Sequence, residues 1–113
     1  MRVLILEDEP IIAIDLEDIV TSGSDDVECF LAASLDGARR HIESGVDFAL
    51  LDINIGHDNN RSYGIAAELM ERRTPFCFVS SMDRSVPTAF ENVPFVSKPF
   101  RPAQILSALP SAT

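Results

Sequence analysis

The chain has 113 residues, of which 46% are hydrophobic, enough for one packed domain and too few for a second. Its 18 acidic and 9 basic residues give a formal net charge of -9, which disfavours binding to nucleic acid or to anionic lipid. No apolar run approaches the roughly 20 residues that span a bilayer, and the apolar start is too short for a signal peptide, so a cytoplasmic location is expected.

The first third of the chain is predicted to contain two strands and the helix between them. Arg2–Leu6 is an apolar strand. A helix begins near Pro10, a residue suited to the first helical turn, and ends at the polar segment 21–24. Its apolar residues share one face, namely Ile12, Leu16, Ile19 and Val20. Val27–Ala32 is the second strand.

The middle of the chain continues the alternation. Ser34 is suited to cap a short helix that ends before Gly45. Phe48–Leu51 is an unbroken apolar run, which is typical of a strand buried on both faces of a parallel sheet. Ile53–Ser62 is polar and irregular, and its loop Gly56–Arg61 suggests no function.

The last part is predicted to hold two helices and two strands. Tyr63–Arg73 is helical, with inward-facing positions at Ile65, Ala66, Leu69 and Met70. Phe76–Ser80 is a fourth strand, Phe95–Ser97 a short fifth strand, and Pro102–Leu109 a brief last helix. The two cysteines, Cys29 and Cys77, lie in apolar segments and are expected to be buried thiols in a reducing compartment.

Five strands that alternate with helices predict an α/β fold, because parallel neighbours need crossover connections. We expect a doubly wound, five-stranded parallel sheet of the flavodoxin-like order 2-1-3-4-5. Only 13 residues separate Ser81 from Phe95, and Pro87 and Pro94 interrupt them. The fourth helix is therefore expected to be shortened to one turn, or replaced by a mobile or disordered loop.

Polar side chains follow four of the predicted strands where each one ends. They are Glu7 and Asp8 after the first strand, Asp52 after the third, Ser80 at the end of the fourth and Lys98 after the fifth. Taken singly, each is an ordinary loop or capping residue. Because ligands bind beyond the carboxyl ends of parallel strands, their shared position predicts one functional site.

The residue types in this site point to phosphoryl chemistry. Clustered carboxylates repel one another unless a cation joins them, and Mg²⁺ suits carboxylates, waters and a phosphate. Asp52 can attack phosphorus to form an aspartyl phosphate. Lys98 and the Ser80 hydroxyl can donate hydrogen bonds to the phosphoryl oxygens. The sequence contains no Gly-rich phosphate loop, so it gives no indication of a nucleotide-binding site.

Two enzymatic alternatives fit less well. A hydrolase triad of Ser80, His57 and Asp52 lacks an oxyanion loop and a nucleophile elbow, and His57 is expected to be a solvated loop residue. A phosphatase with an aspartyl nucleophile would need a second Asp two residues further on, where the chain has Asn54. We therefore expect a phosphoacceptor domain rather than an enzyme.

Four motifs resemble those of response-regulator receiver domains, and the resemblance extends over nearly the whole chain. They are Leu4–Glu9 (LILEDE), Leu50–Asn54 (LLDIN), Ser80–Ser81 and Lys98–Phe100. The resemblance implies a receiver fold, and Mg²⁺-dependent transfer of a phosphoryl group from a sensor histidine kinase onto Asp52.

The resemblance also implies individual roles. Asp8 would bind Mg²⁺ directly, Glu7 through water, and Asn54 through its backbone carbonyl, with Asp52 as both ligand and phosphoacceptor. Ser80 and Lys98 would contact the phosphoryl group, while Phe95 matches the aromatic residue that changes rotamer in the family's switch. For Phe95, a static position in the core is the alternative.

Strand four and the shortened helix are similar to a branch of stand-alone alphaproteobacterial receivers with a motif called FATGUY. Those receivers often have HWE-type kinases as partners, including kinases of general-stress and light responses. Phe78 fits the motif, Ser80 and Met82 are compatible with it, and Val79, Ser81 and Asp83 depart from it.

Residues 1–113 are expected to form a single receiver domain without an output domain. Such a protein acts as a phosphate sink, our first choice, as a relay to a histidine phosphotransfer protein, or as a switch that binds a downstream regulator. The alternative of a different class is a phosphorylation-independent protein-binding module with an acidic metal pocket.

Overall fold

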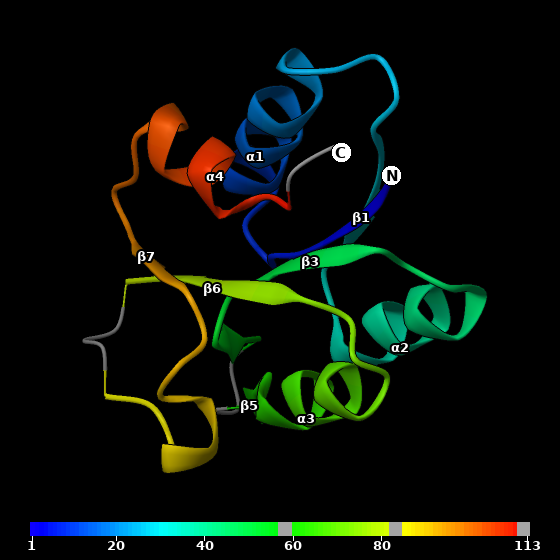
Figure 1. Ribbon diagram of the computed structural model, residues 1–113. Helices are drawn as coiled ribbons and strands as arrows, with labels where there is room; N and C mark the ends of the chain where they lie inside the picture. Colours follow the sequence, from blue (N-terminus) through cyan, green and yellow to red (C-terminus); the bar gives the residue numbers. More distant parts are fainter. Residues whose placement is uncertain (57–59, 82–84, 111–113) are drawn as a thin grey trace.

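The computed structural model describes residues 1–56, 60–81 and 85–110 (Figure 1). Five parallel strands form the central sheet: β1 (Arg2–Leu6), β2 (Glu28–Ala32), β3 (Phe48–Leu51), β6 (Phe76–Ser80) and β7 (Phe95–Ser97). Their order is β2-β1-β3-β6-β7. Counted along the sheet strands alone, this is the predicted order 2-1-3-4-5, and the α/β fold is confirmed.

Two layers of helices cover the sheet, as a doubly wound topology requires. Figure 1 shows α1 (Pro10–Ser22) and α4 (Pro102–Ala108) on one face, with α2 (Leu35–Ser44) and α3 (Tyr63–Glu71) on the other. The predicted cap of α2 is present, because the Ser34 hydroxyl accepts a hydrogen bond from the Gly37 N–H at 3.1 Å. None of the described helices is long and apolar enough to cross a bilayer.

The core is divided by the sheet into two halves, and β1 shows how the sequence fills both. Leu4 and Leu6 pack with the cluster under α2 and α3, whereas Val3 and Ile5 pack with the cluster under α1 and α4. Alternate residues of a strand point to opposite faces, so a strand covered on both sides is apolar throughout. This explains the uninterrupted apolar runs of the central strands.

The structure differs from the sequence-based expectation around α3. Met70 was predicted to face inward, but 46% of its surface is exposed. Helical periodicity places it beside the buried Leu69, at the margin of the apolar face, where the pattern does not distinguish core from rim. The helix also ends at Glu71, two residues before the predicted end, and Arg73 follows with a positive φ of 58°.

A small antiparallel hairpin occupies part of the segment that we expected to be irregular. Its strands are β4 (Asn54–Ile55) and β5 (Asn60–Arg61), in the register Asn54 with Arg61 and Ile55 with Asn60. Ile55 is buried in the core, so the hairpin is fastened to the body of the protein. His57 lies outside the described residues.

In the connection between β6 and β7, the described residues 81 and 85–94 contain one short helical turn, η1 (Thr88–Phe90). This confirms the predicted shortening of the fourth helix. Phe90 is 5% exposed, and its ring lies 5.6 Å from the Tyr63 ring and 5.8 Å from the Phe78 ring. One aromatic side chain therefore fastens the turn to α3 and β6. The predicted mobility of the whole segment stays a prediction.

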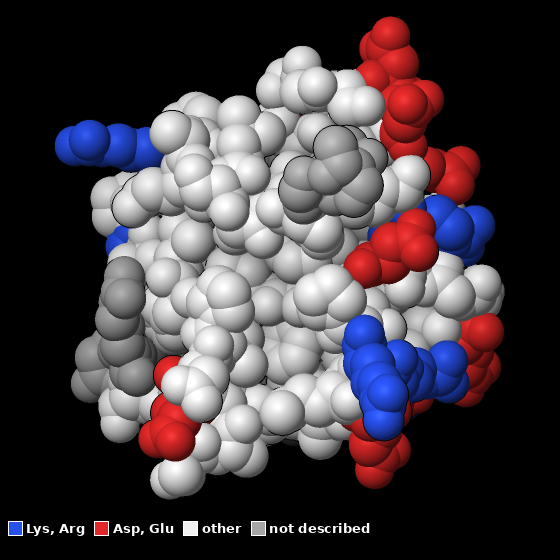
Figure 2. Space-filling model, in the orientation of Figure 1, with Lys and Arg blue, Asp and Glu red and all other residues white. Residues whose placement is uncertain are grey.

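The charged side chains are unevenly distributed. Figure 2 shows them mainly at the margins of the visible face, with mostly uncharged atoms across its centre. Glu68 of α3 pairs with Arg39 of α2 at 3.9 Å and with Arg72 at 3.6 Å. Such partly exposed pairs contribute little to stability, typically about 0–1 kcal/mol each, so the core carries the fold.

The cysteines are free thiols in the structure. Cys77 is buried as expected, whereas Cys29 is only half-buried. Burial raises the pKa of both thiols to about 11, and neither is therefore a reactive thiolate at neutral pH.

Replacing Phe90 with Ala tests whether this ring anchors the short turn. Deleting a buried phenyl ring costs about 3–5 kcal/mol, and we expect a loss of this size in the free energy of unfolding measured with urea. The control is Ile11→Ala, at a side chain that is 83% exposed, where the change should stay within about 0.5 kcal/mol. Equal effects of the two substitutions would contradict the anchoring role.

Candidate functional site

The carboxyl ends of the sheet strands bring the predicted site residues to one edge. The backbone N–H of Glu7 donates to the Ala32 carbonyl at 3.0 Å, and that of Asp52 to the Leu6 carbonyl at 2.9 Å. The N–H of Lys98 donates to the Ser80 carbonyl at 3.0 Å. Sheet pairing therefore continues one residue beyond the strands and fixes the backbone on which the functional side chains stand.

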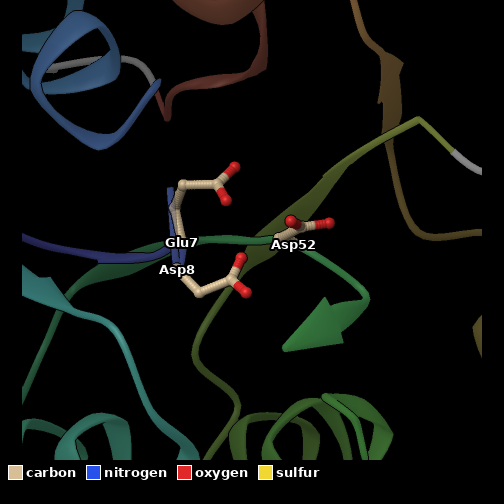
Figure 3. A group of neighbouring side chains, drawn as sticks. All are labelled: Glu7, Asp8 and Asp52. Atoms are coloured by element: carbon tan, nitrogen blue, oxygen red, sulfur yellow. The ribbon is translucent and has the colours of Figure 1, made fainter. Parts of the chain in front are cut away.

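Three carboxyl groups converge at this edge. Oxygen atoms of Glu7, Asp8 and Asp52 lie within 4.8 Å of one another (Figure 3). Glu7 is 3% and Asp52 8% exposed, whereas Asp8 is half-buried. Two of the three carboxyl groups are thus buried away from water. In such a buried position, the charged form of a carboxyl group is costly without a partner.

Lys98 supplies the positive charge in this cluster. Its Nζ donates to Glu7 Oε1 at 2.5 Å and to Asp52 Oδ2 at 3.1 Å. The Lys98 side chain is itself 12% exposed, so both ion pairs are shielded from solvent. Buried pairs of this kind matter because loss of one partner leaves an uncompensated charge.

Burial dominates the acid–base behaviour of the cluster. It raises the pKa of Glu7 from 4.5 to about 7, and the nearby Asp52 charge adds to this, against the lowering effect of the Lys98 hydrogen bond. Burial alone would lower the pKa of Lys98, but the carboxylates of Glu7 and Asp52 outweigh it and raise that pKa. Lys98 is therefore a cation at neutral pH.

Two further carboxylate oxygens accept hydrogen bonds from backbone donors. The Glu9 N–H donates to Glu7 Oε2 at 3.1 Å, and the Gly56 N–H donates to Asp8 Oδ2 at 3.0 Å. No role for Gly56 is evident from the sequence alone. A lone glycine four residues after Asp52 is a weak signal, and only the fold brings it to Asp8.

The other three predicted site residues lie around the cluster. Ser80 is buried at the end of β6, level with Ser97 in the sheet register. Asn54 is exposed, two residues after Asp52, at the start of β4. Phe95 is half-buried on β7, and its ring centre lies 6.3 Å from that of Phe78. Ion pairs join Glu7, Asp52 and Lys98 directly, whereas Ser80 and Phe95 are positioned by the central sheet and Asn54 by the β4–β5 hairpin.

The donor set suits a hard divalent cation. Glu7, Asp8 and Asp52 offer oxygen atoms alone, and their spacing would let one ion contact oxygens from all three. One ammonium group does not balance three carboxylates in the ionised cluster. Mg²⁺ fits this surplus of negative charge and its oxygen ligands.

No family model matches the chain. No curated protein matches it either. Solved structures do: SdrG from Sphingomonas melonis Fr1 is 34% identical over 96% of this chain and 92% of its own, with a TM-score of 0.82. The BeF3-activated conformation of SdrG, named as from Pseudomonas melonis Fr1, is also 34% identical, covers 95% of this chain and 93% of its own, and has a TM-score of 0.75.

A third similar structure belongs to a longer protein, the PhyR stress response regulator. It is 28% identical over 95% of this chain, with a TM-score of 0.72. The matched region is 42% of the PhyR chain. This chain is thus similar to one part of PhyR and to nearly all of SdrG.

The raised pKa of Glu7 gives a pH dependence with a defined sign. The folded protein retains a proton that the unfolded chain releases above pH 4.5, the ordinary pKa. The resulting stabilisation is complete below pH 4.5 and is lost as the pH rises through about 7. In EDTA, we expect the unfolding free energy of the wild type to fall, relative to Glu7→Gln, by on the order of 2 kcal/mol across this range.

Urea unfolding of both proteins at several pH values measures this difference. Glu7→Gln is the matched comparison because it removes the titrating group with little change in shape. Parallel pH profiles for the two proteins would show that Glu7 titrates normally.

Proposed function

Because this chain belongs to the response-regulator receiver family, we propose that it accepts a phosphoryl group from a histidine kinase onto Asp52 in a Mg²⁺-dependent reaction. The observation that carries the proposal is the environment of Asp52. Its carboxylate ends a buried strand, lies against the Lys98 ammonium group at 3.1 Å, and shares a cluster with Glu7 and Asp8.

In the proposed reaction, an Asp52 carboxylate oxygen attacks the phosphorus of a phosphohistidine on the kinase. The new P–O bond forms as the P–N bond breaks, and the electron pair of the broken bond stays on the imidazole nitrogen of the partner. A nearly buried carboxylate suits this step, because little water competes for the phosphorus or for the aspartyl phosphate.

Lys98 and Ser80 would stabilise the transferred group. Lys98 already donates to Asp52, and a phosphoryl oxygen attached there comes within reach of the same ammonium group. Ser80 stands at the end of the neighbouring strand, and its hydroxyl can donate a hydrogen bond to a second oxygen. Both contacts would be stronger with the phosphorylated carboxyl group than with the free one, as stabilisation of the transition state and product requires.

The metal would be held by Asp8 and Asp52 directly, by Glu7 through water and by the backbone carbonyl of Asn54. When bound, Mg²⁺ neutralises charge on the phosphoryl oxygens. Glu7 would give up its proton as the site takes up a cation, since a carboxylate next to added positive charge is favoured in its ionised form.

A structural response can follow from the same residues. If the Ser80 hydroxyl moves toward the phosphoryl group, the space near it becomes available to a ring on β7, and Phe95 is the half-buried aromatic residue there. The described part of the connection between β6 and β7 contains one helical turn, and Phe90 is its one buried residue, so we expect this surface to change more readily than the sheet.

The biological setting is proposed from the relatives. PhyR is named as a stress response regulator, and SdrG is known in a BeF3-activated conformation. We place this chain in a stress response, with light signalling as the alternative, under an HWE-type kinase in the cytoplasm. We propose that it works as a signalling domain and not as an enzyme. Among its possible roles, we favour that of a phosphate sink over relaying to a histidine phosphotransfer protein or binding a downstream regulator.

Phosphoryl transfer from a purified HWE-type kinase with Mg²⁺ tests the acceptor. We expect label on the wild type and none on Asp52→Ala, because the nucleophile is absent from the variant. The control is Asp36→Ala, which removes an exposed carboxylate of α2 and should leave labelling unchanged.

Acetyl phosphate replaces the kinase in a parallel assay, so that a mismatched kinase is recognised. Lack of label on the wild type in both assays would contradict the proposal. It would favour a phosphorylation-independent binding module, which also requires Asp52→Ala to leave partner affinity unchanged.

Lys98→Ala tests the coupling between the phosphoryl group and the fold. With beryllofluoride and Mg²⁺, the wild type should show amide shifts along β6 and β7, and the variant should lose most of them, since the ammonium group that joins Asp52 to β7 is gone. Arg101→Ala, which removes an exposed cation three residues further on, is the control and should respond like the wild type. An undiminished response of Lys98→Ala would make Lys98 a loop residue without a signalling role.

A further inference from the structure

The β4–β5 hairpin forms a fixed arm beside the acidic cluster. It begins two residues after Asp52, and the core residues Ile53 and Ile55 hold its first strand. At its base, the Ser62 N–H donates to the Ile53 carbonyl at 2.8 Å. The arm therefore has a defined position relative to the end of β3.

Gly56 at the turn of this arm contacts the end of a different strand. Its backbone N–H donates to Asp8 Oδ2 at 3.0 Å, although the two residues are 48 positions apart in the chain. This hydrogen bond joins the hairpin to the carboxyl cluster. It restricts rotation of a side chain that is only half-buried.

The orientation of Asp8 shows what this bond achieves. In Figure 3, one of its carboxylate oxygens points toward the space between Glu7 and Asp52, and the other points away from that space. The Gly56 bond to Oδ2 restricts rotation of the carboxylate, and thereby sets the direction in which the oxygen at the cluster points. Ligands that are held by such neighbours bind metal more tightly, because less freedom is lost on binding.

We propose that Gly56 is the positioning residue for the metal ligand Asp8 and thereby sets the affinity of the site for Mg²⁺. The inference rests on the proposed function, which makes Asp8 a ligand. Gly56 acts through Asp8 and needs no contact with the ion.

The backbone of Gly56 explains why glycine is needed at this position. Its φ is 81°, in the left-handed region that side chains with a Cβ atom disfavour. A Cβ atom added here would meet none of the described residues within 4 Å, so no steric clash with them is expected. Its effect comes from the backbone, which leaves this conformation and carries the N–H away from Asp8.

Titration of the metal-free protein with Mg²⁺, followed by amide NMR shifts, measures the affinity without any phosphoryl transfer. We expect Gly56→Ala to bind Mg²⁺ about tenfold more weakly than the wild type, the lower end of the effect for residues that orient ligands. Gly56→Asn should lie between the two, because Asn adopts a positive φ more readily than Ala.

Gly45→Ala is the matched control. Gly45 has a φ of 94° and nothing within 4 Å of an added Cβ atom, but it lies between α2 and β3, at the opposite end of the sheet. It should lower thermal stability as Gly56→Ala does and leave the Mg²⁺ affinity unchanged.

The outcomes separate the inference from its premise. A wild type that binds no Mg²⁺ overturns the proposed metal role of Asp8. A wild type that binds, with Gly56→Ala equally tight or with both alanine variants equally weakened, overturns the role of Gly56 alone. If Gly56→Ala does not fold, the Mg²⁺ affinity of Gly56→Asn is the deciding measurement. A variant that has lost the hydrogen bond to Asp8 and still binds Mg²⁺ as tightly as the wild type overturns the inference.

Discussion

The ion pairs of Lys98 with Glu7 and Asp52 are the constraint on which the site depends. Two almost fully buried carboxyl groups face each other, and ionising both without a cation would cost several kcal/mol. Lys98 Nζ lies between them, at 2.5 Å and 3.1 Å, and makes their burial possible. The same lysine directly follows β7 (Phe95–Ser97), so its ion pairs also link the end of β7 to the ends of β1 and β3.

Parallel strand order converts distant positions into neighbours. Glu7, Asp52 and Lys98 come from three separate parts of the chain, yet β1 and β3 are adjacent and β6 and β7 follow them. Every strand points the same way, so each contributes the residue after its last one to the same edge. The two core clusters on either face hold the strands in register, and a shift of one residue in any of them would turn a site side chain away from the cluster.

Much of this arrangement could be predicted from the sequence, because apolar runs such as Phe48–Leu51 define the strands and the next residue then defines the edge. The prediction was wrong where local pattern carries little information. Helical periodicity put Met70 inward, although it lies at the rim of the apolar face of α3. The hairpin went unrecognised since its strands have two residues each, and Gly56 gains meaning only when the fold brings Asp8 to it.

The two sides of the cluster are built with different rigidity. On the side of Asp8, the hairpin is held by the buried Ile53 and Ile55 and by its own pairing. On the side of Lys98, the connection between β6 and β7 is a single turn with Phe90 as its one buried residue among those described. Local stability follows buried contacts, so under the proposed function a change of charge at Asp52 would displace the lightly held side first. Under the proposed function, a fixed ligand arm beside a lightly held β6–β7 connection would let the metal ligands keep their geometry while the surface around that connection changes.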